Sequence, residues 1–362
     1  MDTVTQIALG AGVGIAVLGR RLGPRRAAIA GGVLGVLPDL DILLRSDDPV
    51  EAFVGHRGWS HSLIAQAAVT PVFGEALMRL VKALREHRAL SYLAVYLAFA
   101  THALLDAMTI YGTRLFWPLM PDPVGVGSIF IIDPLYTLPL LVATIWALCL
   151  RSWSRGFGMV VVSCHVLSTA YLGWGLVAQR IVDGRARTLL AHTGLMPAPV
   201  LTLPTHFNSL FWRVILVAED RYLNLYVPVF GAVDGASAYQ HPRGSDIATC
   251  LNGNGALARL AWFSRGFFRL DQRGKEIVFS DLRMGLTPSY AFQFAIAERG
   301  GDGVRPIPPR YRGDGGGTRS DVEWLLANLW NPPAVRPAEA KSWVDLSRSL
   351  SALKTNAPPL QC

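Results

Sequence analysis

Histidine and aspartate side chains interrupt the apolar first half of this chain, and both residue types are common metal ligands. Three histidines and four aspartates take part: Asp39, Asp41, His56, His61, His102, Asp106 and Asp133. Ionisable side chains are costly to place near hydrocarbon, so their position at the ends of apolar segments indicates a functional site. Their nitrogen and oxygen donors suit zinc, manganese or iron better than an ion that prefers thiolates. The sequence therefore predicts a site for one or two divalent metal ions.

Sequence spacing favours convergence of some of these side chains. His102 and Asp106 are four residues apart in a helical apolar run, so both project from one face and can bind one ion. A hydrogen-bonded helix pair is the alternative for this spacing. Asp39 and Asp41 follow Pro38 where a segment leaves its helix, so both carboxylates can turn toward a common point. A helix cap or a turn is the alternative there.

The stretch from His56 to His61 adds two imidazoles and a guanidinium. Five residues separate the two histidines, which is about 140° around a regular helix. They converge only if His56 lies in the loop before the helix that carries His61. Arg57 stands between them and Arg114 follows Asp106. Either guanidinium could hold an anionic group such as phosphate, and a lipid headgroup or ion-pair contact is the alternative.

The composition indicates a membrane protein rather than a soluble one. Of 362 residues, 51% are hydrophobic and 17% are charged. The apolar residues gather in about six expected membrane segments: 4–18, 27–44, 60–80, 90–108, 131–150 and 158–178. Several of them approach the roughly 20 residues that span a bilayer, and 4–18 is shorter. The net charge of +8 comes without zinc-finger spacing or an RNA-binding signature, which argues against nucleic acid as a partner.

Basic residues gather in three of the loops between these segments. Short loops rich in Lys and Arg stay in the cytoplasm. The basic residues follow the first, third and fifth segments: Arg20, Arg21, Arg25, Arg26, Arg79, Lys82, Arg85, Arg88, Arg151 and Arg155. All three loops then share the cytoplasmic side, and the His and Asp residues fall at the opposite ends of the segments. Charge topology alone therefore predicts that they meet at the extracytoplasmic face.

The second half of the chain has the turn residues and alternation of a soluble, mostly β domain. Alternating stretches occur at 224–230 and 275–279, and paired strands are expected across 267–280 with a break at 271–274. We expect an α-helical membrane bundle over residues 1–180, followed by a mostly β (α+β) extracytoplasmic domain over residues 181–362.

Three segments near the end of the chain carry further expectations. Residues 300–318 are rich in Gly, Pro and Arg and are expected to form a loop. Residues 319–330 and 337–353 could form short helices.

Several motifs resemble those of the YdjM-like family of bacterial inner-membrane proteins, which are described as metal-dependent hydrolases. The motifs lie within residues 1–150: Met1 to Gln6, Leu37 to Asp41, His56 to Ser62, His102 to Asp106, Tyr111 to Thr113 and Ile132 to Thr137. The chain departs from the pattern at Gln6, where many relatives have His. The resemblance implies metal-dependent hydrolysis carried by Asp39, Asp41, His56, His61, His102, Asp106 and Asp133.

The leading interpretation is a hydrolase of the inner membrane that acts on a phosphoester or ester-like bond. The expected metal ligands are Asp39, Asp41, His56, His61, His102 and Asp106. The expected catalytic residues are Asp39, Asp133 and Arg57, with a free aspartate as general base. A site at headgroup depth favours a lipid or lipid-linked envelope substrate. A proton- or metal-coupled transporter and a non-catalytic anchor with a structural metal are the alternatives.

Overall fold

The computed structural model describes residues 1–44, 46–232, 236–301, 303–315, 317–330, 333–347 and 349–350. These residues form two compact units. The first comprises the described parts of 1–45 and 55–176, and the second comprises 46–54 and the described parts of 177–362. Segment 46–54 therefore belongs to the second unit, although both of its flanks belong to the first.

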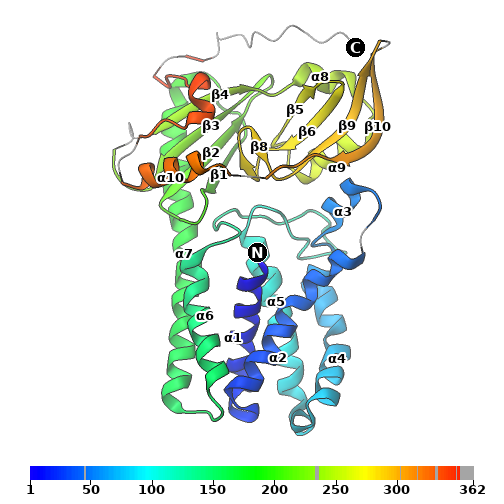
Figure 1. Cartoon of the computed structure of the whole chain (residues 1–362), viewed down its shortest axis with the longest axis vertical. Helices are drawn as coiled ribbons and strands as arrows, with labels where there is room; N and C mark the ends of the chain where they lie inside the picture. Colours follow the sequence, from blue (N-terminus) through cyan, green and yellow to red (C-terminus); the bar gives the residue numbers. More distant parts are fainter. Residues whose placement is uncertain are drawn as a thin grey trace. The chain divides into compact units, whose positions relative to one another are not determined.

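The first unit is a bundle of helices (Figure 1). Its elements are α1 (Thr3–Leu22), α2 (Pro24–Val36), η1 (Leu37–Leu44), η2 (Trp59–His61), α4 (Leu63–Leu80), η3 (Lys82–His87), α5 (Arg88–Met108), α6 (Pro134–Cys149) and the first part of α7 (Arg155–Leu190). Local sequence sets these boundaries. Asp2 caps α1 by accepting a hydrogen bond from the Thr5 amide, and Gly23, with a φ of 80°, ends it. Pro24 then begins α2, where its missing N–H costs nothing.

Glycines bring α1 and α2 into backbone contact. A Cβ atom built on Gly31 would lie 2.2 Å from the Gly10 carbonyl oxygen, and one on Gly14 would lie 2.4 Å from the Ala27 carbonyl oxygen. Small residues at such crossings let two membrane helices approach closely. Because α1 and α2 pack this tightly, the start of α1 and the end of α2 are held in fixed register.

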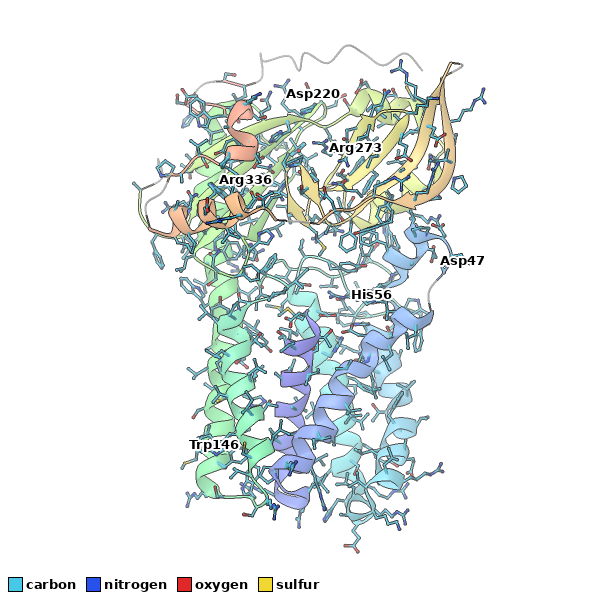
Figure 2. The ribbon with its side chains drawn as sticks, viewed as in Figure 1. Asp47, His56, Trp146, Asp220, Arg273 and Arg336 are labelled. Carbon is cyan, nitrogen blue, oxygen red and sulfur yellow. The ribbon has the colours of Figure 1, made fainter. Side chains whose placement is uncertain are left out.

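Each of the six apolar segments expected from the sequence contains a helix of the first unit or the beginning of α7. By length and composition, four helical spans among the described residues are able to cross a membrane: Thr3–Leu22, Leu63–Leu80, Lys82–Met108 and Arg155–Thr193. Helix α6 is apolar but shorter, and α2 has 13 residues. Many apolar side chains of the bundle point outward, such as Trp146 near the end of α6 (Figure 2), Val72 and Val162. An outward apolar surface of this kind suits a lipid environment.

The second unit contains two four-stranded antiparallel sheets and a two-stranded one (Figure 1). The first sheet, in the order β1-β2-β3-β4, consists of Val200–Pro204, Phe211–Val217, Arg221–Pro228 and Ser237–Pro242. The second, in the order β10-β9-β6-β5, consists of Gly303–Tyr311, Gln293–Gly300, Glu276–Asp281 and Phe268–Arg273. Strands β7 (Gly285–Leu286) and β8 (Ser289–Tyr290) form the small sheet. The C-terminal part of the chain is therefore rich in antiparallel sheet.

Short helices complete the second unit. They are α3 (Pro49–Gly55), η4 (Ala191–Thr193), α8 (Ser245–Cys250), α9 (Gly255–Phe263), α10 (Arg319–Trp330) and η6 (Pro337–Ser342). The expectation of a helix at 319–330 corresponds to α10. The helix expected over 337–353 is shorter than predicted, because only η6 forms among the described residues, and 351–353 lie outside them.

Two expectations about strands are wrong in detail. Residues 271–273 belong to β5, and the turn of the β5–β6 hairpin lies at Gly274, whose φ is 61°. Residues 303–311, expected to be part of a loop, form β10 at the edge of the second sheet. The pairing of β10 with β9 shifts in register between Pro306 and Arg310. Proline lacks the N–H that a central strand needs, but an edge strand with a bulge tolerates it.

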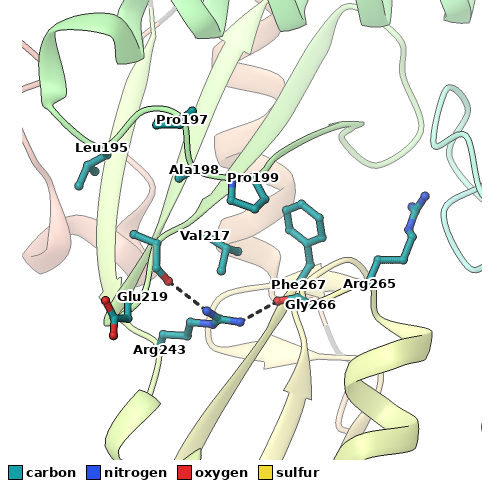
Figure 3. A pocket seen from close by; sticks show the side chains of 11 residues that line it. Leu195, Pro197, Ala198, Pro199, Val217, Glu219, Arg243, Arg265, Gly266 and Phe267 are labelled. Carbon is teal, nitrogen blue, oxygen red and sulfur yellow. Dashed lines mark hydrogen bonds between the residues drawn. The ribbon is translucent and has the colours of Figure 1, made fainter.

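Arg243 joins the two larger sheets at a cavity of about 470 Å³ (Figure 3). Its guanidinium donates to the carbonyl oxygens of Ala218 and Gly266, each at 3.1 Å. Ala218 follows β2, and Gly266 precedes β5. Three of the guanidinium N–H groups bind backbone carbonyls, including that of Phe268, so the main role of this arginine is to hold the sheets together.

Buried polar side chains link η6 to the first sheet. The Glu339 carboxylate is fully buried and accepts hydrogen bonds from Asn224, Tyr226, Arg336 and, at 2.7 Å, His241 Nε2. Burial by itself raises the pKa of Glu339, but the His241 hydrogen bond and the Arg336 charge together lower it to about 2. The ionised carboxylate is therefore part of the folded structure.

Acid is expected to destabilise the second unit through Glu339. Its pKa is lower in the folded chain than in the unfolded chain, so its contribution is complete above about pH 5 and is lost as the pH falls toward 2. In wild type, this effect should lower the unfolding free energy by on the order of 3 kcal/mol between pH 5 and pH 2. We expect Glu339→Gln to remove most of this pH dependence. Denaturant unfolding followed by tryptophan fluorescence between pH 5 and pH 2 measures it. A Gln variant with the wild-type slope would contradict the assignment.

Candidate metal centre

Four side-chain atoms from three separate parts of the first unit converge on one point. The atoms are Asp39 Oδ1, His61 Nε2, His102 Nε2 and Asp106 Oδ2, and all lie within 4.8 Å of one another. The two imidazole nitrogens are 3.0 Å apart. Asp39 Oδ1 lies 3.3 Å from the His61 nitrogen and 3.4 Å from that of His102, and Asp106 Oδ2 lies 3.4 and 3.6 Å from the same two atoms.

Each ligand is placed by an element whose local sequence explains its form. Helix α2 gives way to the 3₁₀ helix η1 at Leu37, directly before Pro38, and η1 carries Asp39. His61 ends η2, and Ser62 then caps α4. His102 and Asp106 lie one turn apart near the end of α5, so both side chains reach the same point, as their spacing predicted.

Hydrogen bonds from outside the cluster orient both imidazoles. His102 Nδ1 lies 2.6 Å from the carbonyl oxygen of Gly35, which can only accept, so Nδ1 carries the proton. His61 Nδ1 lies 2.9 Å from Ser60 Oγ, which in turn donates to Asp41 Oδ2 at 2.7 Å. Partners of this kind fix the ring and its tautomer in metal sites. Each Nε2 is therefore turned toward the cluster.

Asp41 and His56, predicted as ligands, form a pair beside the four-atom cluster rather than part of it. Asp41 Oδ1 lies 2.9 Å from His56 Nδ1, and Asp41 Oδ2 accepts from the Arg57 amide and from Ser60. Asp41 Oδ2 is 3.7 Å from His61 Nδ1, on the side of that ring away from the cluster. His56 lies in the loop before η2, at the end of the helical bundle (Figure 2). The pair therefore helps to orient the His61 ring from its Nδ1 side and supplies no atom to the cluster.

Arg57 lies against the cluster in an unusual backbone conformation. Its φ is 60°, in the left-handed region that costs a non-glycine residue free energy. Its Nε atom is 3.0 Å from Asp106 Oδ2, and its Nη1 donates to Thr109 Oγ1 at 3.2 Å. The guanidinium also stacks over Tyr111 at 4.7 Å. Arg114 contacts this region through its amide, which donates to the Arg57 carbonyl.

The structure does not bring Asp133 into the cluster. Asp133 caps α6: its Oδ1 accepts from the amides of Leu135 and Tyr136, and its Oδ2 accepts from the Tyr171 hydroxyl at 2.9 Å. Both oxygens are occupied by these bonds. The side chain therefore holds the start of α6 against α7.

Two groups outside the predicted site residues contact Asp106. Gln6 Nε2 donates to Asp106 Oδ1 at 3.0 Å, and the Met1 amino group pairs with the same oxygen. A glutamine in an apolar helix was the available signal, since a polar amide near hydrocarbon needs a partner. These contacts leave Asp106 Oδ2 directed at the cluster, where it accepts no hydrogen bond from the described residues.

The donor set fits a divalent ion. Ligand bonds of about 2.0 to 2.1 Å around a tetrahedral zinc ion place neighbouring donors about 3.3 to 3.4 Å apart. Five of the six donor pairs are 3.0 to 3.6 Å apart, and the sixth, between the two carboxylates, is within 4.8 Å. The two carboxylates supply the negative charge that such an ion needs, and the Arg57 guanidinium and the Met1 amino group lie against one of them, Asp106. Asp106 Oδ2 is buried and accepts no hydrogen bond from the described residues, with the Arg57 guanidinium as an ion-pair neighbour, so this oxygen remains available to a cation.

Comparison with protein families decides the assignment. The family model of the YdjM inner membrane protein matches residues 1–182, which is half of the chain. The chain belongs to the YdjM inner membrane protein family. This result confirms the resemblance drawn from the sequence motifs. Comparison with curated proteins and with solved structures gives no match.

Membership of the YdjM family and the apolar helices together imply a lipid bilayer environment for the first unit. All four cluster residues lie within the matched range, as do Asp41, His56 and Arg57. Most of the β-rich second unit lies beyond residue 182, outside the match. The site therefore belongs to the part of the chain that is shared with the YdjM family.

Proposed function

We propose that this YdjM-family protein is a membrane-bound metal-dependent hydrolase that cleaves a phosphoester or another ester-like bond. The observation that carries the proposal is the convergence of Asp39, His61, His102 and Asp106 on one point. The nitrogen and oxygen donors suit zinc, manganese or iron, and the cluster has room for one ion. When bound, a divalent ion supplies the Lewis acidity that hydrolysis of such bonds requires.

The chain's own residues fit the remaining tasks of hydrolysis. Asp39 is the partly exposed member of the cluster, at 23%, and its Oδ2 has no partner among the described residues. That oxygen is placed to take a proton from water, whose oxygen bonds to the phosphorus or acyl carbon as the ester oxygen leaves. Arg57 directs Nε and Nη1 at Asp106 and Thr109, which leaves Nη2 to hold an anionic oxygen of the substrate.

An apolar groove beside the site supports a substrate with a hydrocarbon chain. It has a volume of about 470 Å³, and its wall runs along α2 and η1 from Ala28 to Leu40, the residue that follows Asp39 in the chain. Eight helical steps at 1.5 Å and four 3₁₀ steps at about 2 Å give a length of roughly 20 Å. The hydrocarbon of one leaflet is about 15 Å thick. A lipid or lipid-linked substrate would place its chain here and its ester group near the cluster.

Hydrolysis of dissolved alkyl phosphates should depend on chain length. We expect kcat/KM of the metal-loaded protein in nanodiscs to rise with each added methylene, by at most about fourfold per group, since burying one contributes about 0.8 kcal/mol. Gly32→Leu should flatten this dependence, because Gly32 lines the groove and an added Cβ meets only ordinary contacts there, the nearest at 3.4 Å. Phosphate release from butyl to decyl phosphate measures it.

The matched control is Gly173→Leu, in α7. An added Cβ at Gly173 meets nothing within 4 Å, and this residue does not line the groove. This variant should keep the wild-type chain-length dependence. Equal hydrolysis rates with and without metal would contradict the proposed hydrolase activity. A wild-type rate that does not depend on chain length would contradict only the proposed role of the groove.

We further propose that the site and the C-terminal domain from residue 181 onward face the extracytoplasmic side. The three loops with the basic residues join α1 to α2, α4 to α5 and α6 to α7, and they lie at the end of the bundle opposite η1 (Figure 1). Their Lys and Arg residues favour a cytoplasmic position. Alkaline phosphatase fused after residue 190, which is active only outside the cytoplasm, tests this orientation, and an inactive, well-expressed fusion would reverse it.

A further inference from the structure

The loop between η1 and η2 enters the C-terminal unit at its tip. Residues 46–54, which include most of α3, belong to the second unit, while Asp41 before them and His56 after them belong to the first. The base of this loop is closed by the Asp41–His56 pair. Residues 46–54, which belong to the second unit, are therefore flanked in the sequence by the Asp41–His56 pair, which lies beside the candidate cluster of the first unit.

Charge holds the start of α3 in the second unit. Asp48 caps α3 by accepting from the Val50 amide, and its other oxygen accepts from Arg259 Nη2 at 2.9 Å. Arg259 Nη1 donates to Glu51, also at 2.9 Å. One guanidinium on α9 therefore bridges both carboxylates of this segment, and such fork-like contacts fix direction as well as distance.

Aromatic packing holds the end of α3. Phe53 is 6% exposed, and its ring centroid lies 4.3 Å from that of Phe292, 4.8 Å from Phe263 and 5.3 Å from Phe294. Phe263 lies one turn after Arg259 on α9, so one helix face supplies both kinds of contact. Pairs with these centroid separations pack favourably beyond their buried area.

Only a short stretch of chain separates the tip of the loop from the site residues. His56 follows Phe53 by three residues, so the two Cα atoms are at most about 11 Å apart. Three short contacts connect His56 to His61. His56 Nδ1 lies 2.9 Å from Asp41 Oδ1, and Ser60 Oγ donates to Asp41 Oδ2 at 2.7 Å. Ser60 Oγ also lies 2.9 Å from His61 Nδ1. His61 Nε2 is a donor atom of the cluster.

We propose that the C-terminal unit positions the metal centre through α3, with Arg259 and Phe263 as positioning residues. The proposal rests on the metal site of the proposed function. It assigns to the β-rich unit a role in holding the loop that carries His56, Arg57 and His61. Release of α3 from α9 would loosen the base of the loop and with it the direction of the His61 ring.

The test is Co²⁺ binding to the full chain in nanodiscs, read from the visible ligand-field spectrum. Arg259→Ala should weaken Co²⁺ affinity about threefold to tenfold, at or below the lower end of what loss of an outer partner of a metal ligand causes, since Arg259 acts on His61 only through α3 and the loop. Its spectrum should also shift, because the His61 donor is reoriented. Arg259→Lys, which keeps the positive charge, should restore most of the affinity. Arg310→Ala is the matched control, because Arg310 is similarly exposed and pairs with Glu298 on β9 instead.

Hydrogen exchange of residues 56–61 without metal gives a second reading. We expect exchange at least about tenfold faster in Arg259→Ala than in wild type or Arg310→Ala, because the loop base opens more often. If wild type binds Co²⁺ and Arg259→Ala binds it equally well with the same spectrum, the proposal is overturned. If wild type binds no Co²⁺, the proposed function fails, and unchanged exchange at 56–61 would then also refute positioning by α3.

Discussion

His61→Ala is expected to abolish stoichiometric metal binding. The variant removes one of four donors, and the remaining three are the partly exposed Asp39 and the buried His102 and Asp106. Substitution of an outer partner of a metal ligand already lowers affinity by about 10- to 100-fold, so loss of a direct ligand should exceed the upper value. Metal content after purification, together with competition titration against a chelator, measures the change. Hydrolytic turnover should fall in proportion to the metal content.

His56→Ala serves as the matched control for this prediction. His56 pairs with Asp41 beside the cluster and supplies no atom to it. Its loss should lower affinity by no more than about tenfold, since it acts through Asp41 and Ser60. Wild-type protein without metal after gentle purification would refute the metal centre. A larger loss in His56→Ala than in His61→Ala would place His56 among the ligands.

Gly31→Ala is expected to destabilise the helical bundle by about 3 kcal/mol or more. The added Cβ would lie 2.2 Å from the Gly10 carbonyl oxygen and 2.7 Å from Gly14 Cα, and both neighbours are backbone atoms of α1. Overpacking in a well-packed core usually costs 1 to about 3 kcal/mol, and rigid backbone on both sides leaves little room to relax. Helix α1 would have to move away from α2. Unfolding by increasing SDS in mixed micelles, followed by circular dichroism, measures the loss.

Gly31→Ala should also disturb the residues that orient the metal ligands. Helix α1 carries Gln6, which binds Asp106, and the end of α2 supplies the Gly35 carbonyl that orients His102. Gly173→Ala is the control, because its Cβ would meet nothing within 4 Å and alanine is the better helix former by about 1 kcal/mol. A Gly31→Ala protein as stable as the control would show that the two helices are not in close contact.

The helices and the general place of the site follow from elementary energetics. In a membrane, the backbone N–H and C=O groups of a long apolar segment must form hydrogen bonds within a helix, and a charged side chain there needs a partner. These two rules predict the helix that carries both His102 and Asp106, and they predict that polar residues from other segments gather with this pair. The four-residue spacing of this pair follows from helix geometry alone.

Sequence spacing does not determine which carboxylate and which imidazole enter the cluster. Asp39 and Asp41 are the same residue type and only two positions apart, yet η1 directs Asp39 to the cluster and Asp41 to Ser60. The choice depends on the turn of a 3₁₀ helix, which has no strong sequence signature. His56 and His61 separate in the same way, because Arg57 adopts a left-handed conformation between them.

Tertiary context overrides local composition in the second unit as well. Residues 303–311 contain three prolines, which favour a loop in isolation, but the neighbouring strand β9 offers partners on both sides of the bulge. Segment 46–54 is another example, because its packing depends on Phe263 and Phe294, which lie far along the chain. The sequence of neither segment predicts contacts with these distant residues.

The uneven exposure of the four donors has a kinetic consequence. Asp39 is 23% exposed, while His61, His102 and Asp106 are at most 1% exposed. An ion would then enter and leave past the Asp39 carboxylate, since the other three donors are buried. A chelator would reach a bound ion from that side alone, so the centre would lose its ion slowly even where the equilibrium favours removal. Brief treatment with a chelator would then leave the ion bound.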